Sequence, residues 1–381
     1  MYRHSIEASG GRRARRVIDF YKNSGLEDIA AKVEAGERLG SEEGLRLLKS
    51  DDLLAVGRLA DTVRRRKHGD RVYYILNRHI NHTNICVNRC KFCAFGRDEA
   101  DTGAYTLTLD EIEAKALDYR GRGITEIHIV GGLNEKLPLD YYVEMLKRVR
   151  RALPGVIIQS FTAVEIDYLA RVNSMTVEQV LAVLQEAGLD SLPGGGAEVF
   201  SPRVRELICP KKISGDRWLE VHGAAHGLGM RTNATILYGH VETPEERIDH
   251  FIRLRELQDR TGGFLAFIPL AFHPKNTQLD QGSSPSTGYD DLKMLALARL
   301  MLDNFDHIKA FWIMIGPKIA QVSLSFGVND LDGTVEEEKI VHDAGAETDQ
   351  RLPRDELVRM IRAAGRVPVE RDTLYNIIRE G

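Results

Sequence analysis

The pattern of apolar and polar positions changes at about residue 70. Before that point, apolar residues recur every three or four positions, as in LEDIAAKVEA and GLRLLKSDDLLAVGRLADTV, which is the spacing of one face of an α-helix. Ser41 before two glutamates, and Ser50 with Asp51 before the next apolar run, are typical helix starts. The pattern therefore predicts an N-terminal helical extension over residues 1–71.

From residue 72 onward, short apolar runs alternate with amphipathic stretches of a dozen residues or more. This alternation is typical of parallel strands joined by helical crossovers. Besides a separate short strand at VYYIL, we predict strands at 81–86, 126–132, 156–161, 189–196, 231–239, 264–272, 308–316 and 323–333. Strands in this order predict an α/β fold, a closed (β/α)8 barrel of the TIM type, over residues 72–333.

Two further features of the sequence concern the type of fold and the C-terminal segment. No GxGxxG turn follows the first strand, which argues against a doubly wound dinucleotide-binding fold. DELVRMIRAAG and VERDTLYNIIREG read as helices and turns, so residues 334–381 are predicted to be a C-terminal helical segment packed on the barrel.

Composition and charge narrow the class of protein. The chain of 381 residues is 43% apolar and 28% charged, as in soluble globular proteins. Its net charge of −4 gives no case for a nucleic-acid partner, and the short basic runs Arg12–Arg16 and Arg64–Lys67 read as solvated helix faces or a mobile terminus. Without an apolar signal region or a long apolar span, we expect no membrane segment and a cytoplasmic location.

Three clustered cysteines, Cys86, Cys90 and Cys93, are the strongest chemical signal, in NHTNICVNRCKFCAF. They form no disulfide framework and suit a reducing compartment. Structural zinc sites and fully ligated iron–sulfur clusters use four protein ligands, whereas this loop supplies three. The spacing therefore favours a [4Fe–4S] cluster with one iron open to a substrate or cosubstrate. Zinc, with His82 or Cys209 as a fourth ligand, is the alternative.

Polar and glycine-rich residues gather where the predicted strands end. Any one group is compatible with ordinary turn chemistry. Active sites of (β/α)8 barrels lie at the carboxyl ends of the strands, so their concentration on one rim predicts a single site there. Besides the cysteine loop, the groups are residues 131–134, 160–165, 194–196 with Glu198, 238–240, 273–277 and 329–330.

These residues resemble the radical S-adenosylmethionine (SAM) enzymes, and in particular the branch of menaquinone and deazaflavin biosynthesis. The similarity covers roughly residues 70–350 and rests on NHTNICVNRCKFCAF, IVGGLN, LPGGGAE, ETPEERIDH, LRELQDRTGGFLAFIPLAFHPKNT and SLSFGVNDLDGTVEEEKI. Within the branch the chain is most similar to the aminofutalosine synthases. His273 and FWIMIGPK stand where the futalosine cyclases usually carry glutamine and a Trp-Val-Thr-Gln-Gly-like run.

The resemblance implies a cofactor and a cosubstrate. Cys86, Cys90 and Cys93 would hold the [4Fe–4S] cluster, and SAM would bind its open iron and be consumed. Further residues would contact the adenine, the amino group or the ribose hydroxyls of SAM. They are Phe92, Gly131, Gly132, Ser160 and Glu165.

The resemblance also implies a reaction. The adenosyl radical would add to the enolpyruvyl double bond of 3-[(1-carboxyvinyl)oxy]benzoate, and rearrangement with loss of a carboxyl group would give 6-amino-6-deoxyfutalosine. The substrate's two carboxylates call for cationic or N–H donors. The candidates for the carboxylates are Arg78, His82, Arg231 and His273, and those for the substrate rim are His273, Asn276, Thr277, Asn329 and Asp330, with His273 and Asp330 as catalytic residues.

A low-potential electron donor such as flavodoxin or ferredoxin is the expected partner. The futalosine cyclases and the deazaflavin synthase subunits are the close alternatives and differ by substrate. A non-catalytic barrel stabilised by zinc is the remote one.

Overall fold

The N-terminal extension is helical where it is described. The computed structural model describes residue 21 and residues 24–279 and 285–381. Its first described helices are α2 (Glu27–Ala35), α3 (Ser41–Lys49) and α4 (Leu53–His68). The helix caps are Gly40, whose N–H donates to Glu43 at 2.9 Å, and Asp52, which accepts from the N–H of Ala55 at 2.9 Å. The helical prediction is confirmed here, while Arg12–Arg16 lies outside the described residues.

The second basic run belongs to the packing of α4. Arg64 is fully buried, pairs with Asp61 at 2.7 Å and donates to the carbonyl of Gly69 at 2.7 Å. Lys67 pairs with Asp306 at 3.4 Å. Arg65, Arg66 and Lys67 are exposed on α4, so the predicted solvated helix face is confirmed for them and wrong only for Arg64.

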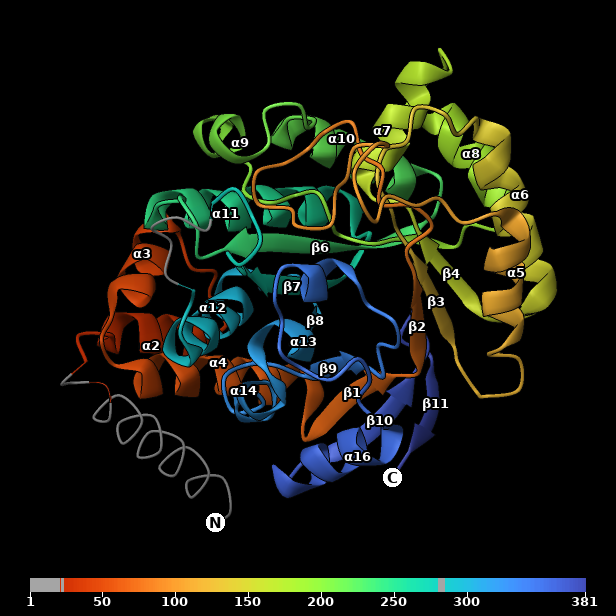
Figure 1. The fold of residues 1–381 in the computed structure, drawn as a ribbon. Helices are drawn as coiled ribbons and strands as arrows, with labels where there is room; N and C mark the ends of the chain where they lie inside the picture. The colour runs from red at the N-terminus through yellow and green to blue at the C-terminus, as the bar shows by residue number, and fades with distance from the viewer. Residues whose placement is uncertain (1–20, 22–23, 280–284) are drawn as a thin grey trace.

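A parallel sheet of seven strands forms the centre of the molecule (Figure 1). Its strands, which neighbour one another in chain order, are β2 (Asn77–Ile80), β3 (Glu126–Ile129), β4 (Ile157–Ser160), β5 (Ser191–Leu192), β6 (Arg231–Tyr238), β7 (Phe264–Ala271) and β8 (His307–Ile308). Every pairing is parallel. Sequential parallel strands joined by helices confirm the predicted barrel type.

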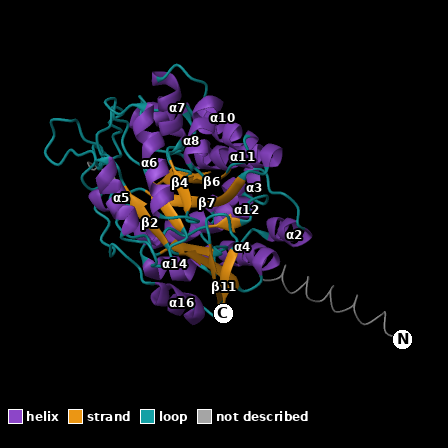
Figure 2. Cartoon of the chain, turned by 90° about the vertical axis from the view of Figure 1, so that its right-hand side faces the viewer, coloured by secondary structure: helices purple, strands orange, loops and turns teal. Residues whose placement is uncertain are grey.

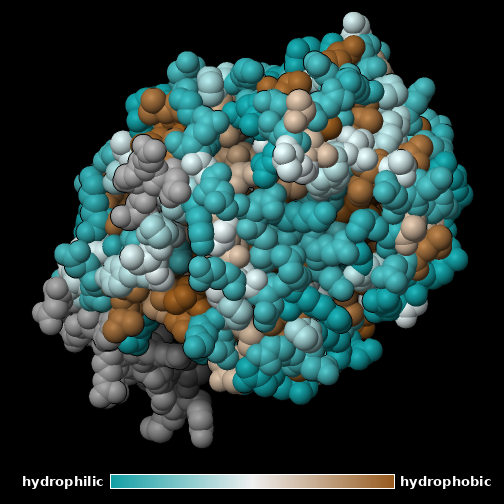
Figure 3. All heavy atoms as spheres, in the orientation of Figure 1, coloured by the Kyte–Doolittle hydropathy of each residue, from teal (hydrophilic) through white to brown (hydrophobic). Residues whose placement is uncertain are grey.

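Helices surround the sheet on its outer face (Figure 2). They are α5 (Leu109–Leu117), α6 (Leu139–Ala152), α7 (Ala163–Val172), α8 (Val177–Ala187), α9 (Pro202–Ile208), α10 (Gly215–Gly227), α11 (Pro244–Thr261) and α12 (Gly288–Met301). Several begin with a threonine that caps the N–H three residues on, as Thr162 does for Glu165. None of the described helices is long and apolar enough to cross a lipid bilayer. The surface in the view of Figure 3 is mainly hydrophilic, with hydrophobic side chains in small groups.

The barrel is closed by residues 330–336, which begin with β9 (Asp330–Gly333) and bridge the last and first strands of the sheet. The backbone of Asp330 forms a parallel β-bridge with that of Lys309, just after β8. The carbonyl of Glu336 accepts from the N–H of His79 on β2 at 3.0 Å. The eighth strand is therefore present but short. β9 also pairs with β1 (Arg71–Ile75) in a second sheet of order β11-β10-β1-β9.

Two predicted strands are misplaced. The first error concerns residues 81–86, which were predicted to be the first strand of the barrel. They form the loop after β2, and β2 is the strand that takes this place. The second is 308–316, where the strand ends at Ile308 and the apolar run continues as helix α13 (Trp312–Ile315), followed by α14 (Pro317–Ser323). Trp312 is fully buried and donates to the carbonyl of Gly333 at 2.8 Å. A short buried helix and a buried strand give the same apolar run, so the pattern does not separate them.

The C-terminal segment is only partly helical. It contains α15 (Ile340–Asp343) and α16 (Arg354–Ala363), and then the strands β10 (Val367–Arg371) and β11 (Ile377–Glu380). The prediction of helices and turns is therefore wrong for residues 367–380. β10 pairs in parallel with β1, so tertiary pairing decides the structure of a segment whose own pattern is weak.

Candidate active site

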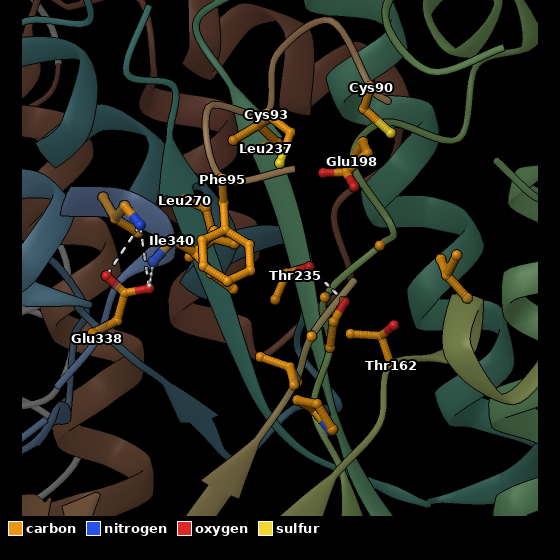
Figure 4. A pocket seen from close by; sticks show the side chains of 18 of the residues that line it. Cys90, Cys93, Phe95, Thr162, Glu198, Thr235, Leu237, Leu270, Glu338 and Ile340 are labelled. Carbon is orange, nitrogen blue, oxygen red and sulfur yellow. Dashed lines mark hydrogen bonds between the residues drawn. The ribbon is translucent and has the colours of Figure 1, made fainter. Parts of the chain in front are cut away.

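A cavity of about 330 Å³ lies inside the barrel, toward the carboxyl ends of the strands (Figure 4). The cysteine loop lines one end of it. Apolar side chains also line the cavity, and we call this group the apolar sleeve. Its members are Phe95, Leu237, Ile268, Leu270, Phe311 and Met314. Polar side chains from the barrel interior line its other end, which we call the floor, and include His79, His128, Asn233, Lys309 and Asp332.

All three motif cysteines line the cavity. Cys90 is buried, and Cys86 and Cys93 are partly buried. The loop is fixed through its backbone: the N–H of Cys86 donates to Arg97 at 3.0 Å, and that of Cys93 donates to Cys90 at 3.0 Å. Figure 4 shows the sulfur atoms of Cys90 and Cys93 at the same end of the cavity.

Gly132 lets this loop approach the end of β3. A Cβ atom at this position would lie 2.2 Å from the carbonyl oxygen of Ile85 and 3.0 Å from Cβ of Cys86. The N–H of Gly132 also donates to the carbonyl of Thr83 at 2.8 Å. Only glycine fits so close to the backbone beside the first cysteine.

Burial keeps two of the motif cysteines as neutral thiols until a metal binds. Burial raises the pKa of Cys90 to about 12, and it also raises the pKa of Cys93. Backbone N–H groups of Gly96 and Phe95 oppose the shift at Cys93, and the charge of Lys212 opposes it at both. Buried thiols of this kind lose their protons on binding metal, which supplies the compensating charge.

The three thiols match the ligand set of a [4Fe–4S] cluster with one open iron. Within the described ranges, no three His, Cys, Asp or Glu side chains converge as one metal ion would require. In an iron–sulfur cluster each thiolate binds a different iron, so convergence on one point is not needed. Cys209 is buried beside Lys212 and does not line the cavity.

Glu165 and Gly131 meet at the wall next to the cysteine loop. The N–H of Gly131 donates to Oε1 of Glu165 at 3.1 Å, and the N–H of Thr162 donates to Oε2 at 2.7 Å. Burial raises the pKa of Glu165 to about 7, against the opposing effect of the hydrogen bonds from Thr162 and Gly131. Glu165 therefore titrates near neutral pH in a position where a cationic or hydroxyl group of a ligand could reach it.

Several predicted site residues line the cavity together: Cys86, Cys90, Phe92, Cys93, Gly131, Gly132, Glu165 and His273. His273 is at the rim, where its Nε2 lies 2.9 Å from the carbonyl oxygen of Met314. These residues come from four separate parts of the chain, as the concentration of polar residues on one rim predicted.

Three predicted residues near the first strands lie outside the cavity. Ser160 is fully buried and donates to the carbonyl of Ile129 at 2.9 Å. Arg78 points away from the barrel, where it stacks at 3.4 Å over the ring of Tyr119 and pairs with Glu337 at 2.7 Å. His82 is fully buried behind the cavity wall, with its ring against the backbone of Gly131. Each of the three packs against other parts of the protein, whereas the sequence analysis placed it in the site.

Asn276, Thr277 and Arg231 also lie elsewhere. Asn276 donates to the carbonyl of Asp343 at 3.0 Å, and Thr277 donates to the carbonyl of Pro274 at 2.6 Å. Arg231 is the first residue of β6, at the end of the strand away from the cysteines, and donates to the carbonyl of Gly263 at 3.2 Å. All three bond to backbone carbonyls of the chain, and only the bond of Thr277 stays within its own loop.

Asn329 and Asp330 lie at the wrong end of the barrel for the predicted roles. Asp330 accepts from Arg371 at 2.7 Å and from the hydroxyl of Tyr375 at 2.8 Å, in a fully buried ion pair. Asn329 accepts from Arg299 at 2.6 Å. Both residues come before or at the start of β9, so they join the barrel to the second sheet. Their position corrects the prediction of a catalytic Asp330 and a substrate-binding Asn329.

The floor is the part of the site that sequence reasoning missed. His79 and His128 stack with ring centroids 4.5 Å apart, and Nδ1 of His128 lies 3.2 Å from the side-chain oxygen of Gln159. Lys309 pairs with Asp332 at 3.1 Å. These side chains occupy alternate positions of strands that also carry apolar residues. That alternation, in NRHI and EIHI, was the available signal.

Comparison with known proteins points to one family. Residues 80–254 match the radical SAM superfamily, and residues 261–380 match the CofH/MqnC C-terminal region. An aminodeoxyfutalosine synthase of Thermus thermophilus is 49% identical over 92% of this chain and 95% of its own length.

Two further relatives carry other names. A 5-amino-6-(D-ribitylamino)uracil–L-tyrosine 4-hydroxyphenyl transferase of Archaeoglobus fulgidus is 43% identical over 87% of this chain and 97% of its own. A cyclic dehypoxanthine futalosine synthase of Streptomyces coelicolor is 40% identical over 92% of this chain and 88% of its own. Among solved structures, methylornithine synthase has the same fold, with a TM-score of 0.70 at 20% identity over 89% of this chain and 96% of its own.

Proposed function

We propose that this chain, which belongs to the radical SAM superfamily and carries the CofH/MqnC C-terminal region, is an aminofutalosine synthase. The observation that carries the proposal is the 49% identity to the aminodeoxyfutalosine synthase of Thermus thermophilus over nearly the whole of both chains. The chain is a radical SAM enzyme and, as a member of the superfamily, uses a [4Fe–4S] cluster and SAM. The substrate is the finer step that we propose.

The three motif cysteines would hold the cluster. When bound, it supplies the electron that cleaves SAM into methionine and an adenosyl radical. Glu165, held by Gly131 and Thr162, is placed to bind SAM through its ribose hydroxyls or amino group. Phe92 lines the same end of the cavity and is placed to contact the adenine.

The rest of the cavity would position the second substrate. Its apolar sleeve would enclose the aryl ring and exclude water and other hydrogen donors from the radical. In the proposed reaction, the adenosyl carbon forms a bond to the vinyl carbon of 3-[(1-carboxyvinyl)oxy]benzoate. The aryl–oxygen bond then breaks as the ring migrates to the neighbouring carbon, and the carboxyl group leaves as carbon dioxide together with the one electron that cleaved SAM, which gives 6-amino-6-deoxyfutalosine for menaquinone biosynthesis.

The second candidate is a cyclase or transferase of the same branch, which the relatives at 40% and 43% identity support. The two proposals differ in the fate of the adenosyl group. A synthase incorporates it into the product, whereas an enzyme that starts by abstracting hydrogen releases 5′-deoxyadenosine.

An anaerobic reaction tests the proposal. The reconstituted protein is mixed with SAM, a chemical reductant and the enolpyruvyl benzoate, and the products are read by mass spectrometry. A product that carries the adenosine group, together with free methionine, supports the synthase. Free 5′-deoxyadenosine alone would favour the second candidate. No SAM cleavage by protein with a full cluster would contradict both.

We also propose that a flavodoxin or ferredoxin reduces the enzyme and that it works in the cytoplasm. Both follow from the proposed reaction, which needs a low-potential donor and a reducing compartment.

A further inference from the structure

The floor of the cavity contains polar groups that lack partners. His79 and Asn233 are 8% and 4% exposed and both line the cavity. Neither side chain hydrogen-bonds any residue in the described part of the chain, although the ring of His79 stacks on His128. Buried polar groups in proteins are almost always satisfied by protein, water or ligand. His79 and Asn233 therefore have hydrogen-bonding capacity left for polar atoms that enter the cavity.

Lys309 gives the floor a positive charge. It is 5% exposed, and its ammonium group, which has three donors, meets one carboxylate oxygen, on Asp332 at 3.1 Å. Burial raises the pKa of Asp332, which disfavours the anion that would neutralise Lys309. The other acid at this end, Glu126, is already bonded to Asn77 at 3.2 Å and to Thr373 at 2.9 Å.

The histidines of the floor stay neutral. Burial lowers the pKa of His79 well below its usual value, and the nearby His128 and Lys309 lower it further; burial also lowers the pKa of His128. A neutral imidazole offers one N–H donor and one acceptor. Together with the amide N–H groups of Asn233 and the ammonium of Lys309, it makes a set of donors suited to a carboxylate.

The two other cations that line the cavity belong to its opposite end. Lys212 pairs with Glu198 at 2.5 Å and influences Cys90. Arg89 lies 3.6 Å from Asp98 and 3.5 Å from Asp101. Lys309 is therefore the one Lys or Arg of the described cavity lining that lies on the floor.

We propose that Lys309, His79 and Asn233 form the binding site for the ring carboxylate of the substrate. The aryl ring then lies in the apolar sleeve, and the enolpyruvyl double bond is directed toward the cysteine loop. This assignment rests on the proposed function and adds to it the orientation of the substrate. It also replaces Arg78, His82 and Arg231, which lie outside the cavity, as the carboxylate-binding residues.

The test is equilibrium binding without turnover. Protein loaded with cluster and SAM, and given no reductant, is titrated by calorimetry with the enolpyruvyl benzoate and with 2-phenoxyacrylate, which lacks the ring carboxylate. Lys309→Met should weaken binding of the benzoate about ten- to hundredfold, the range of a hydrogen bond to a charged group. It should change binding of 2-phenoxyacrylate less than about threefold. Asn233→Ala should also weaken binding of the benzoate, but by less than Lys309→Met does.

Two controls separate binding from folding. Lys275→Met removes an exposed lysine outside the cavity and should leave both affinities unchanged. Lys309→Met with Asp332→Asn replaces both members of the buried pair, so that neither side chain is left without its partner. The double variant should keep its affinity for 2-phenoxyacrylate and lose affinity for the benzoate.

The outcomes distinguish the two proposals. Equal loss for both ligands in the double variant, or no loss in either Lys309 variant, overturns the floor assignment. If the wild-type protein then still forms the adenosine-bearing product, the proposed function stands. If the wild-type protein does not bind the enolpyruvyl benzoate, both proposals fail.

Discussion

Gly132→Ala is the sharpest test of how the fold positions the cysteine loop. The added Cβ would meet the carbonyl oxygen of Ile85 at 2.2 Å, whereas ordinary van der Waals contact begins at 3.4 Å. The backbone must therefore move by 3.4 − 2.2 = 1.2 Å. The obstacle is backbone and not the end of a side chain, and the next residue, Cys86, must move with it.

The expected cost is large for one methyl group. Overpacking of a tight site costs about 1–3 kcal/mol, and a rigid backbone obstacle favours the upper value. With an unfolding entropy of about 2.1 cal/mol/K per residue, ~3 kcal/mol in this chain corresponds to a fall in Tm of about 4 °C. The displacement of Cys86 should also reduce the iron and sulfide that the protein binds on anaerobic reconstitution.

Thermal unfolding of the metal-free protein and iron analysis of the reconstituted protein measure the two effects separately. Gly227→Ala is the matched control: it changes a helical glycine whose Cβ would have no neighbour within 4 Å. It should raise stability by up to ~1 kcal/mol and leave iron binding unchanged. If Gly132→Ala bound iron and unfolded like the wild type, the argument that this contact fixes the loop would be refuted.

Alanine at any one of the three motif cysteines should abolish the cluster absorption, whereas Cys209→Ala should retain it; loss of the cluster in Cys209→Ala would make that thiol a ligand. Burial raises the pKa of Glu165 from 4.5 to about 7, so its proton stabilises the fold fully below about pH 4.5, and this contribution is lost as pH rises through about 7. Denaturant titrations of the metal-free protein at about pH 5 and pH 8 should show a loss of about 2.5 kcal/mol in the wild type that is absent in Glu165→Gln. Equal losses in the two proteins would contradict the shift. Asp330→Asn breaks a buried pair with Arg371 and should lower the free energy of unfolding by about 3–5 kcal/mol without changing KM; a changed KM at normal stability would restore a role for Asp330 in the site.

The parallel barrel was predictable because its strands bury apolar residues on both faces. The strands β3, β4, β6 and β7 stand out as apolar runs between amphipathic helices, and all were found. β2 was missed because NRHI has one apolar residue in four, and yet all four residues are buried. Asn77 and His79 of this strand face the polar part of the cavity, so a search for apolar runs does not find a strand that lines the site.

That error explains the failed site residues near β2. Placing the strand at 81–86 removed the alternation that turns His79 inward and Arg78 outward, because successive side chains of a strand point to opposite faces. The same kind of error affected Asp330, which was placed near the end of a strand but begins β9. The cysteines and glycines were found because their roles depend on local spacing, which the chain displays directly.

The pairing of β1 with β10 has a consequence for the order in which the chain can fold. Arg71 is opposite Val367, so strands that are 367 − 71 = 296 residues apart lie side by side. β1 in turn supports β9, which closes the barrel. At about 5–20 residues per second, a ribosome adds the last of these strands long after the cysteine loop has emerged. The loop must therefore wait until β10 has been synthesised before its cavity is complete, which favours late insertion of the cluster.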